Sequence, residues 1–310
     1  MSSLLRVPAP AKLNLFLHVV GQRPDGYHLL QSVFTFIELY DYLDFTVRSD
    51  GVIERQGQTL EGLTAENDLI IRAARLLQHH TGTTLGVSIQ CEKHIPAGAG
   101  LGGGSSNAAT TLMALNRLWG TGLNRQQLMD LGLQLGADVP VFIFGRSAFA
   151  EGVGEHLQAV PVPDLYYVLL KPAVSVPTPT IFRDKGLTRD SKPIIITDFT
   201  GYQTQPDADY HQSVAMFGSN VLEPVACKYA AEINDLLLSL RKRKLHARMT
   251  GSGSCLFIAF CDKETATRQS IQLCGTILHE QPMVQKSPDI QVVKGLHTHP
   301  QYNWLTEFGD

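Results

Sequence analysis

Five glycines within residues 98–104 give this sequence its clearest chemical signal. Residues 85–91 before them alternate in hydrophobicity like a strand, and residues 109–115 after them have helical spacing. A glycine loop between a strand and a helix N-terminus exposes backbone N–H groups to an anion, and the helix dipole adds partial positive charge. We therefore predict a cradle for the phosphate chain of a nucleotide, in preference to a flexible linker.

The loop differs from two better-known phosphate loops. A P-loop ends in Gly-Lys-Ser/Thr, whereas Gly104 is followed by Ser105 and the loop holds no lysine. Its glycines fit the letters G-x-G-x-x-G, but no Asp or Glu lies between Glu92 and Asp130 to bind the ribose of a dinucleotide. A stretch without carboxylates is compatible with a bound phosphate chain.

Two further positions can take part in catalysis. Lys12 and Asn14 share one face of a strand because side chains repeat every two residues. A lysine there can face a ligand, or it can protect an exposed sheet edge. Asp138 lies in a short loop after a helix, where a carboxylate can accept a proton from a hydroxyl or can bond local backbone.

Other segments favour a ligand less strongly. The loop at 251–254 resembles a second glycine-rich loop, but it can also be a tight turn. Tyr27 and His28 lie at the mouth of a hairpin, where they can stack on a flat ring or form a surface pair. Thr178-Pro179 indicates a stiff extended segment, and Phe182 after it has the character of a core residue.

The composition is that of a globular chain of 310 residues, 44% hydrophobic and 18% charged, which is long enough for two domains. The net charge of −3 and the pI of about 6.4 argue against a nucleic-acid partner, and the basic cluster at 241–244 suits a solvated helix end. Five cysteines without C-x-x-C predict reduced thiols. With no signal-peptide pattern and no apolar run of membrane length, we expect a cytoplasmic protein without a membrane partner or an obligate protein partner.

Residues 7 to about 155 form one unit of mixed strands and helices. We predict a hairpin around Arg23-Pro24-Asp25-Gly26, a helix from Asn67 or Asp68 to His79, a helix with the capping box Asn124–Gln127 that ends at Leu135, and an apolar strand over 141–144. Because the strands and helices follow no strict βαβ rhythm, we expect an α+β fold rather than a doubly wound sheet.

The second half begins near Tyr166. We expect strands over 166–170 and 255–260, helices at about 213–219, 228–243 and 264–274, and an exposed polar excursion over 183–212. His297 and His299 have no accompanying ligands that would indicate a metal site, so we expect a frayed, solvated end. The predicted domains are 1–160 and 161–310.

These signals occur in a known order, and the chain resembles the GHMP kinase superfamily. The resemblance rests on Pro10-Ala11-Lys12, on residues 96–106 and on Thr250-Gly251-Ser252-Gly253-Ser254-Cys255. It implies an α+β, two-domain GHMP kinase fold. The N-terminal domain would be like domain 2 of ribosomal protein S5, the C-terminal domain would be a ferredoxin-like α/β sandwich, and a cleft would lie between them.

The resemblance also implies a reaction. The γ-phosphoryl group of ATP would pass to the tertiary 2-hydroxyl of a cytidyl diphosphate sugar alcohol, a step of the non-mevalonate isoprenoid pathway. Asp138 would take the hydroxyl proton, while Lys12 would orient the hydroxyl and offset the charge of the aspartate. This division suits phosphoryl transfer, which depends mostly on positioning and charge stabilisation.

The ligand contacts implied by the resemblance fall into two groups. ATP would contact Asp68, Leu69, Lys93, Pro96, Gly98, Gly100, Leu101, Gly102, Gly103, Gly104, Ser105 and Ser106. The acceptor substrate would contact Asn14, Tyr27, His28, Thr178, Phe182, Gly251 and Ser252. Mg²⁺ would be held mainly through ATP phosphates and water, and we assign it no protein ligand.

Two alternatives remain open on the sequence. One is another small-molecule kinase of the superfamily, of the mevalonate or homoserine type. The other is a ligand sensor without catalysis on the same fold. The presence of both Lys12 and Asp138 disfavours the sensor, and the Tyr27-His28 pair favours the cytidyl substrate.

Overall fold

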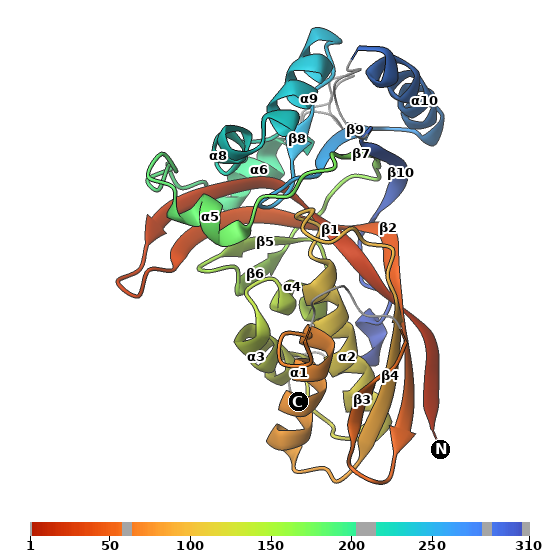
Figure 1. Cartoon of the computed structure of the whole chain (residues 1–310). Helices are drawn as coiled ribbons and strands as arrows, with labels where there is room; N and C mark the ends of the chain where they lie inside the picture. The colour runs from red at the N-terminus through yellow and green to blue at the C-terminus, as the bar shows by residue number, and fades with distance from the viewer. Residues whose placement is uncertain (1, 58–63, 203–214, 281–286, 306–310) are drawn as a thin grey trace.

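The computed structural model describes residues 2–57, 64–202, 215–280 and 287–305, and two long antiparallel strands form its spine (Figure 1). These strands, β1 (Ser3–Gln22) and β2 (His28–Arg48), run side by side across the molecule. The predicted turn joins them: the Arg23 N–H donates to the Tyr27 carbonyl at 2.7 Å, and Gly26 has a φ of +89°. The hairpin prediction is confirmed.

The other strands extend this hairpin into a ten-stranded sheet. The main path has the order β3-β4-β2-β10-β7-β9-β8, with β1, β5 and β6 attached beside it. The bounds are β3 (Ile53–Arg55), β4 (Gly86–Glu92), β5 (Ala148–Glu151), β6 (His156–Ala159), β7 (Tyr166–Lys171), β8 (Arg248–Met249), β9 (Leu256–Phe260) and β10 (Asp289–Leu296). This mixture of one sheet with two helical groups agrees with the predicted α+β class.

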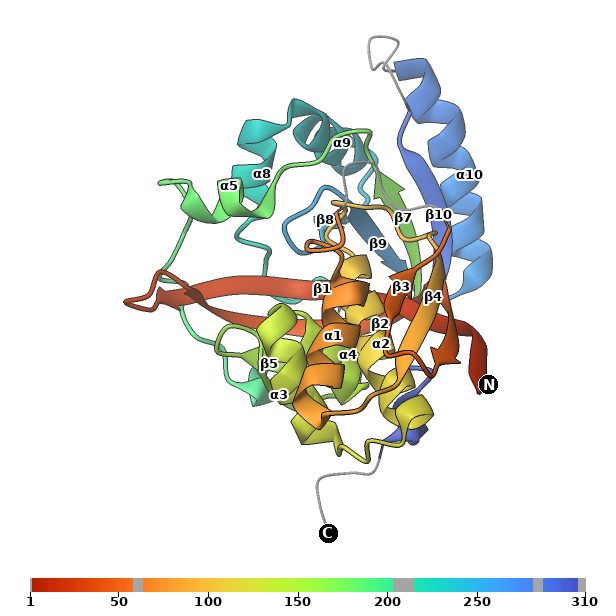
Figure 2. The same cartoon turned by 60° about the horizontal axis from the view of Figure 1, so that its bottom comes forward.

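The first helical group packs on the hairpin from one side, as Figures 1 and 2 both show. Its central member is α2, whose Leu112 and Leu115 pack in one core cluster with Phe36 and Phe45 of β2. The predicted caps are present, because Asp68 accepts a hydrogen bond from Ile70 N and the capping box of α3 is complete. The helices are α1 (Leu69–Thr81), α2 (Gly103–Trp119), α3 (Arg125–Leu135) and α4 (Val139–Phe144).

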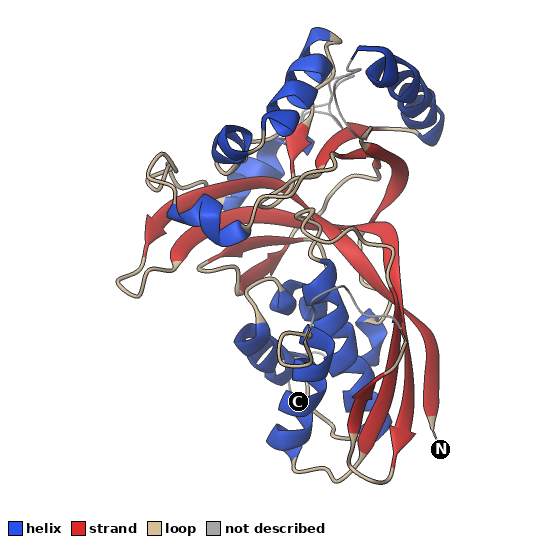
Figure 3. Ribbon diagram, viewed as in Figure 1, coloured by secondary structure: helices blue, strands red, loops and turns tan. Residues whose placement is uncertain are grey.

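The second helical group covers the strands of the other half (Figure 3). Leu236 and Leu240 of α9 share a buried cluster with Val168 of β7 and Ile258 of β9. The basic cluster at 241–244 lies at the C-terminal end of α9, as predicted. The helices are α5 (Thr178–Arg183), α6 (Ile196–Tyr202), α8 (Glu223–Tyr229), α9 (Ala231–Lys242) and α10 (Lys263–Glu280).

The last strand joins the two halves of the sheet. β10 pairs with β7 over residues 289–294 and then with β2 through Gly295 and Leu296. The chain continues into the first half, where a short 3₁₀ helix (Tyr302–Trp304) follows and Leu305 enters the core cluster of α1–α4. His299 is only 2% exposed. The expected frayed, solvated end is therefore wrong for residues 299–305, because this segment completes the packing of the first half. His297 is exposed, and residues 306–310 lie outside the described residues.

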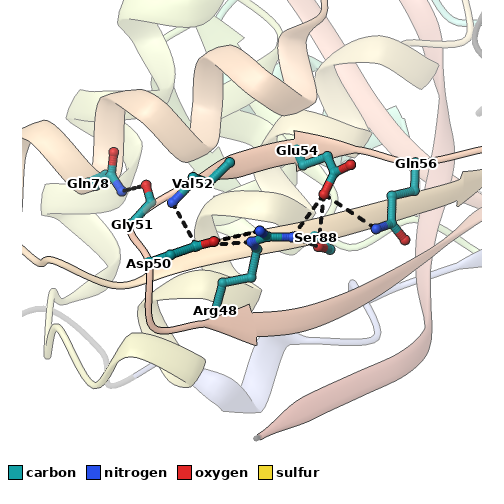
Figure 4. Close-up of polar contacts among 8 residues, drawn as sticks. All are labelled: Arg48, Asp50, Gly51, Val52, Glu54, Gln56, Gln78 and Ser88. Atoms are coloured by element: carbon teal, nitrogen blue, oxygen red, sulfur yellow. Dashed lines mark hydrogen bonds and ion pairs between the residues drawn. The ribbon is translucent and has the colours of Figure 1, made fainter.

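A polar network fastens the far edge of the sheet, where β2 turns into β3 (Figure 4). Arg48 binds Asp50 at 2.5 Å and Glu54 at 2.9 Å, and Gln78 of α1 donates to the Gly51 carbonyl at 2.8 Å. The Arg48 side chain is 31% exposed and that of Asp50 is 48% exposed, so screening by solvent limits what these ion pairs add to stability. These contacts hold the turn at Asp50-Gly51 in place.

Two short segments differ from the prediction. Residues 141–144 belong to the helix α4, with Pro140 in its first turn and Gly145 at φ +75° after its end. The expected strand is wrong because four apolar residues are too few to show a period. Thr178-Pro179 is not extended either: it begins α5, because proline is well suited to a first helical turn.

Two longer segments also differ. The predicted helix over 228–243 is two helices, α8 and α9, with extended backbone at Ala230 (φ −139°, ψ 99°). The described part of the 183–212 excursion is not simply exposed, because Leu187 and Phe199 are buried. Residues 203–212 lie outside the described residues, as do residues 213 and 214 of the helix expected at 213–219. The domain boundary near residue 160 stays a prediction.

Within the described ranges, no helix is both long and apolar enough to cross a bilayer.

Candidate active site

Lys12 is the buried centre of the candidate site. Its side chain is 3% exposed, and its Nζ donates to Asn14 Oδ1 at 2.5 Å and to the Gly100 carbonyl at 3.0 Å. Register shifts before Ala11 and after Asn14 bracket this part of β1, and such bulges redirect side chains. A buried lysine with these partners does not protect an exposed sheet edge, so that alternative for Lys12 is wrong.

Asp138 supplies the opposite charge. One of its carboxylate oxygens lies 3.5 Å from Lys12 Nζ, and its side chain is 40% exposed. It occupies the N-cap position of α4, yet the side chain makes no capping hydrogen bond to that helix. The carboxylate therefore faces the lysine from the mouth of the site while it remains open to a substrate.

The two glycine loops meet beside this pair. A Cβ at Gly100 would lie 2.1 Å from the Thr250 carbonyl oxygen, and Cys255 N donates to the Ala99 carbonyl at 3.2 Å. A Cβ at Gly251 would lie 3.2 Å from Lys12 Nζ. Glycine is required at these positions because the two backbones approach too closely for a side chain.

The N-terminus of α2 lies in the same place. A Cβ at Gly102 would lie 3.1 Å from Lys12 Cε, and α2 begins at the next residue. The first N–H groups of a helix have no partners within it. The Ser106 hydroxyl, which is buried in the first turn, also has no hydrogen-bond partner among the described residues. The N–H groups can bind an anion, and the hydroxyl oxygen can also contact a cation.

The predicted adenosine contacts surround the other side of the loop. Leu69 Cδ1 would lie 3.4 Å from a Cβ at Gly104, and Lys93 Nζ would lie 3.4 Å from one at Gly103. Asp68, however, is 5% exposed and already caps α1 and pairs with Arg55 at 3.4 Å. Its observed contacts are structural.

Asp41 organises the entrance to the first loop and was not foreseen. It is fully buried, pairs with Lys93, and accepts hydrogen bonds from His94 N at 2.7 Å and Ile95 N at 2.9 Å. An acidic residue between Tyr40 and Tyr42 of a long strand gives no sign of this role in the sequence.

The remaining predicted residues of the first glycine loop lie between β4 and the first turn of α2. Pro96 begins the turn and is half-buried, Leu101 is 1% exposed and accepts a hydrogen bond from Lys12 N at 3.0 Å, and Gly98 adopts a φ of +62° against Ser175. Ser105 is half-buried in the first turn of α2. The structure thus brings the predicted loop residues together around one helix terminus.

The helix α5 connects the second glycine loop to the hairpin mouth. Thr178 at its start shares a 2.7 Å hydrogen bond with Ser252, and Phe182 near its end packs on the ring of His28 at 5.0 Å. A six-residue helix is about 9 Å long. One ligand can therefore reach from the glycine loops to His28.

The hairpin mouth combines an exposed and a half-buried aromatic residue. Tyr27 is 62% exposed, whereas His28 is half-buried between Phe182 and the guanidinium of Arg189. Burial, and secondarily the charge of Arg189, lower the pKa of His28 below its ordinary value. Arg189 was not foreseen, because it lies in the segment that the sequence presents as a polar excursion.

Asn14 links Lys12 and the strand β2 to the second glycine loop. Its Nδ2 donates to the Ser32 hydroxyl at 2.7 Å, and its backbone N–H donates to Thr250 Oγ1 at 2.9 Å.

Within the described ranges, no group of three or more His, Cys, Asp and Glu side chains is arranged to hold a metal ion.

Comparisons with known proteins agree with this geometry. Residues 68–146 match the family described as GHMP kinases N terminal domain. A 4-diphosphocytidyl-2-C-methyl-D-erythritol kinase of Bordetella parapertussis is 49% identical over 310 residues, covering 98% of this chain and 99% of its own. The corresponding kinase of Ralstonia pickettii is 56% identical over 259 residues, covering 84% and 86%. The chain belongs to the 4-diphosphocytidyl-2-C-methyl-D-erythritol kinase family.

Solved structures share the fold of this chain. A 4-(cytidine 5′-diphospho)-2C-methyl-D-erythritol kinase superposes with a TM-score of 0.70 at 31% identity, covering 95% of this chain and 99% of its own. The homoserine kinase of Cytophaga hutchinsonii has a TM-score of 0.68 at 16% identity, with 96% of each chain covered. At that identity the likeness shows the fold alone, and it confirms the GHMP kinase fold.

Proposed function

We propose that this protein transfers the γ-phosphoryl group of ATP to the 2-hydroxyl of 4-diphosphocytidyl-2-C-methyl-D-erythritol, a step of the non-mevalonate isoprenoid pathway. The observation that carries the proposal is the approach of Asp138 to within 3.5 Å of the buried Lys12, beside two glycine loops, in a chain of this family. A ligand sensor has no need of such a pair.

The pair divides the work of activating a poor nucleophile. Asp138, which is open to the site, accepts the proton of the tertiary hydroxyl. Lys12, fixed by Asn14 and Gly100, orients that hydroxyl and balances the charge of the carboxylate. Because phosphoryl transfer needs little covalent help, this positioning and charge balance account for the protein's part in catalysis.

The first loop and the start of α2 are the proposed phosphate cradle. Gly102, Gly103, Gly104 and Ser105 lie where the unpaired N–H groups of the helix face the site. Leu69 and Lys93 border the loop on its outer side, so they are the proposed adenosine contacts.

Mg²⁺ is expected with ATP, and one side chain beside the proposed phosphate cradle fits it. The buried Ser106 hydroxyl, without a hydrogen-bond partner among the described residues, is the group that would contact the ion; the phosphates and water would supply the rest. Bound there, the ion would neutralise phosphate charge. Residues 93–129, which include the loop, contain no Asp or Glu, so no carboxylate of the loop itself would repel the phosphates.

The cytidyl end of the substrate is proposed to lie at the hairpin mouth. Tyr27, His28 and Phe182 offer aromatic faces there. Asn14, Thr178, Gly251 and Ser252 would contact the remainder, since α5 leads from these residues to His28. A cytoplasmic location and the absence of nucleic-acid and obligate protein partners stay predictions.

A direct assay tests the proposal. Phosphoryl transfer from ATP is measured with the cytidyl compound, mevalonate and homoserine as acceptors. We expect turnover with the cytidyl compound alone. Turnover with mevalonate or homoserine instead would refute the substrate, and ligand binding without any turnover would refute the kinase.

A further inference from the structure

Arg189 is held in an unusually complete hydrogen-bond frame at the hairpin mouth. Its Nη2 donates to the carbonyls of Phe182 and Asp184, both at 2.9 Å, and its Nη1 donates to the Leu187 carbonyl at 3.1 Å. Its Nε donates to His28 Nε2 at 3.1 Å. The guanidinium therefore sits in a cup of backbone carbonyls and presents one N–H to the imidazole.

The frame is itself anchored. Asp184, which is 6% exposed, accepts hydrogen bonds from Gly186 N, Lys228 Nζ and the Tyr229 hydroxyl, each at 2.7 Å. These contacts tie the end of α5 to α8. The position of Arg189 is thus set by the second helical group rather than by the hairpin that carries His28.

The contact decides where the imidazole keeps its proton. A guanidinium stays charged and only donates, so His28 Nε2 must accept and must carry no hydrogen. A neutral imidazole then has its proton on Nδ1. Phe182 covers one face of the ring, at a centroid distance of 5.0 Å and an interplanar angle of 39°. The Nδ1–H group is the polar group that His28 retains for a ligand.

We propose that Arg189 is a positioning residue for the acceptor substrate: it fixes His28 as a neutral imidazole whose Nδ1–H donates to an acceptor atom of a pyrimidine base. The proposal rests on the proposed function for the identity of the ligand. A pyrimidine such as cytosine offers a ring nitrogen and a carbonyl oxygen as acceptors. Without Arg189 the imidazole can exchange tautomers or take up a second proton, and it then presents no single pattern to the base.

Among the described residues, the other charged groups near this imidazole already have partners. Arg23 and Asp25 in the neighbouring turn pair with each other at 2.7 Å, and Gln22 opposite His28 on β1 is uncharged. Glu151 of β5 accepts a hydrogen bond from Gln31 at 2.9 Å. Removal of Arg189 should therefore change the protonation of His28, because burial alone would then oppose protonation of the ring.

Nuclear magnetic resonance tests the protonation directly. The imidazole nitrogens of ¹⁵N-histidine-labelled protein are recorded at pH 7, and His28 is assigned from its missing signals in His28→Gln. We expect hydrogen on Nδ1 and an unprotonated Nε2, with a shift of the Nδ1 signal when cytidine 5′-diphosphate is added. Hydrogen on Nε2, or a doubly protonated ring, would overturn the inference whatever the activity.

Kinetics test the consequence with three variants. Arg189→Met keeps an aliphatic stem and removes every donor. Arg189→Lys keeps the charge and a single donor nitrogen in place of the guanidinium. Arg183→Met removes an exposed arginine from the same segment and is the control. For Arg189→Met we expect KM for the cytidyl substrate to rise about 3- to 10-fold with kcat and the KM for ATP unchanged. Arg189→Lys should recover part of this loss, and Arg183→Met should match the wild type.

The pH profile separates positioning from a general structural role. With Arg189 removed, the pKa of His28 should rise, so the acidic limb of kcat/KM should move to higher pH in Arg189→Met and not in Arg183→Met. An unmoved limb together with an unchanged KM would refute the inference. Wild-type protein with the expected tautomer and the nucleotide-induced shift, but without turnover, would refute the proposed function while the positioning role of Arg189 stands.

Discussion

At the scale of single residues, Lys12 and Asp138 differ sharply in their surroundings. The lysine is 3% exposed and hydrogen-bonded to Asn14 and Gly100, whereas the carboxylate is 40% exposed and makes no capping bond. Taking a charge out of water is costly unless partners replace the water, and Lys12 has such partners. The group that we propose gains and loses a proton is the one left accessible.

Asp138→Asn tests this assignment. The amide cannot take the hydroxyl proton, so we expect kcat to fall about 10²- to 10⁴-fold, while ATP still binds with its normal affinity because the glycine loops are untouched. Steady-state kinetics and calorimetric ATP titration measure the two effects. Asp130→Asn, an exposed change on α3, is the matched control and should retain activity. A normal kcat in Asp138→Asn would show that Asp138 is not the general base.

How far the sequence predicts the site depends on the kind of residue. The glycine loop is predictable because its spacing has a direct physical meaning, and the strand face that pairs Lys12 with Asn14 follows from a period of two. The role proposed for Asp138 came only from the resemblance to kinases. Asp41 and Arg189 were not predictable, because each acts through contacts with chain segments far away in sequence.

At the scale of elements, the six-residue helices α4 and α5 position the site although neither was predicted. α4 places Asp138 at its N-terminus, and α5 joins Ser252 to His28 through Thr178 and Phe182. A helix of fewer than two turns shows no readable apolar period, so its proline and glycine boundaries are the available signal. The longer helices α1 and α3, which carry clear caps, were predicted correctly.

The contact between the two glycine loops gives a prediction for an element. Gly100→Ala would place a Cβ 2.1 Å from the Thr250 carbonyl oxygen at a φ of +75°. Left-handed strain and overpacking together should lower the free energy of unfolding by about 3 kcal/mol, and KM for ATP should rise. Urea unfolding and steady-state kinetics measure both.

Gly122→Ala is the matched control for that experiment. Gly122 has nearly the same φ, +70°, but nothing lies within 4 Å of its Cβ position. It should therefore lose only the strain of about 1–2 kcal/mol, with unchanged KM for ATP. Equal losses in the two variants would show that the loops do not need their close approach.

At the scale of the whole molecule, the chain end is a structural part of the first half. Arg125, which is 1% exposed, donates to the Ile143 carbonyl at 2.7 Å and to the Tyr302 carbonyl at 2.9 Å. His299 lies edge-on to Phe36 at 5.8 Å, and its backbone N–H donates to the Gly145 carbonyl at 2.9 Å. Burial, with a smaller effect of Arg125, lowers the pKa of His299 to about 3.

This buried imidazole predicts how stability depends on pH. Because the unfolded chain binds a proton near pH 6.5 and the folded chain does not, stability from this group is present above pH 6.5 and is lost progressively as the pH falls toward 3. Between pH 7.5 and 5.5 its loss should be about 1.4 kcal/mol. Urea unfolding at the two pH values should show this difference reduced in His299→Gln.

His297→Gln is the control for that measurement. His297 is an exposed residue that pairs with Asp164 at 2.9 Å, so its removal should leave most of the pH dependence in place. An equal pH dependence in His299→Gln and in the wild type would mean that the buried imidazole does not set it.

The place of β10 has a consequence for how the protein is made in the cell. Residues 289–296 leave the ribosome after both β2 and β7, yet they fill the position between these two strands. Until they arrive, the edges of both strands remain open to pairing with other chains, a hazard for a nascent polypeptide. The two parts of the sheet therefore stay separate until the residues of β10 have been made.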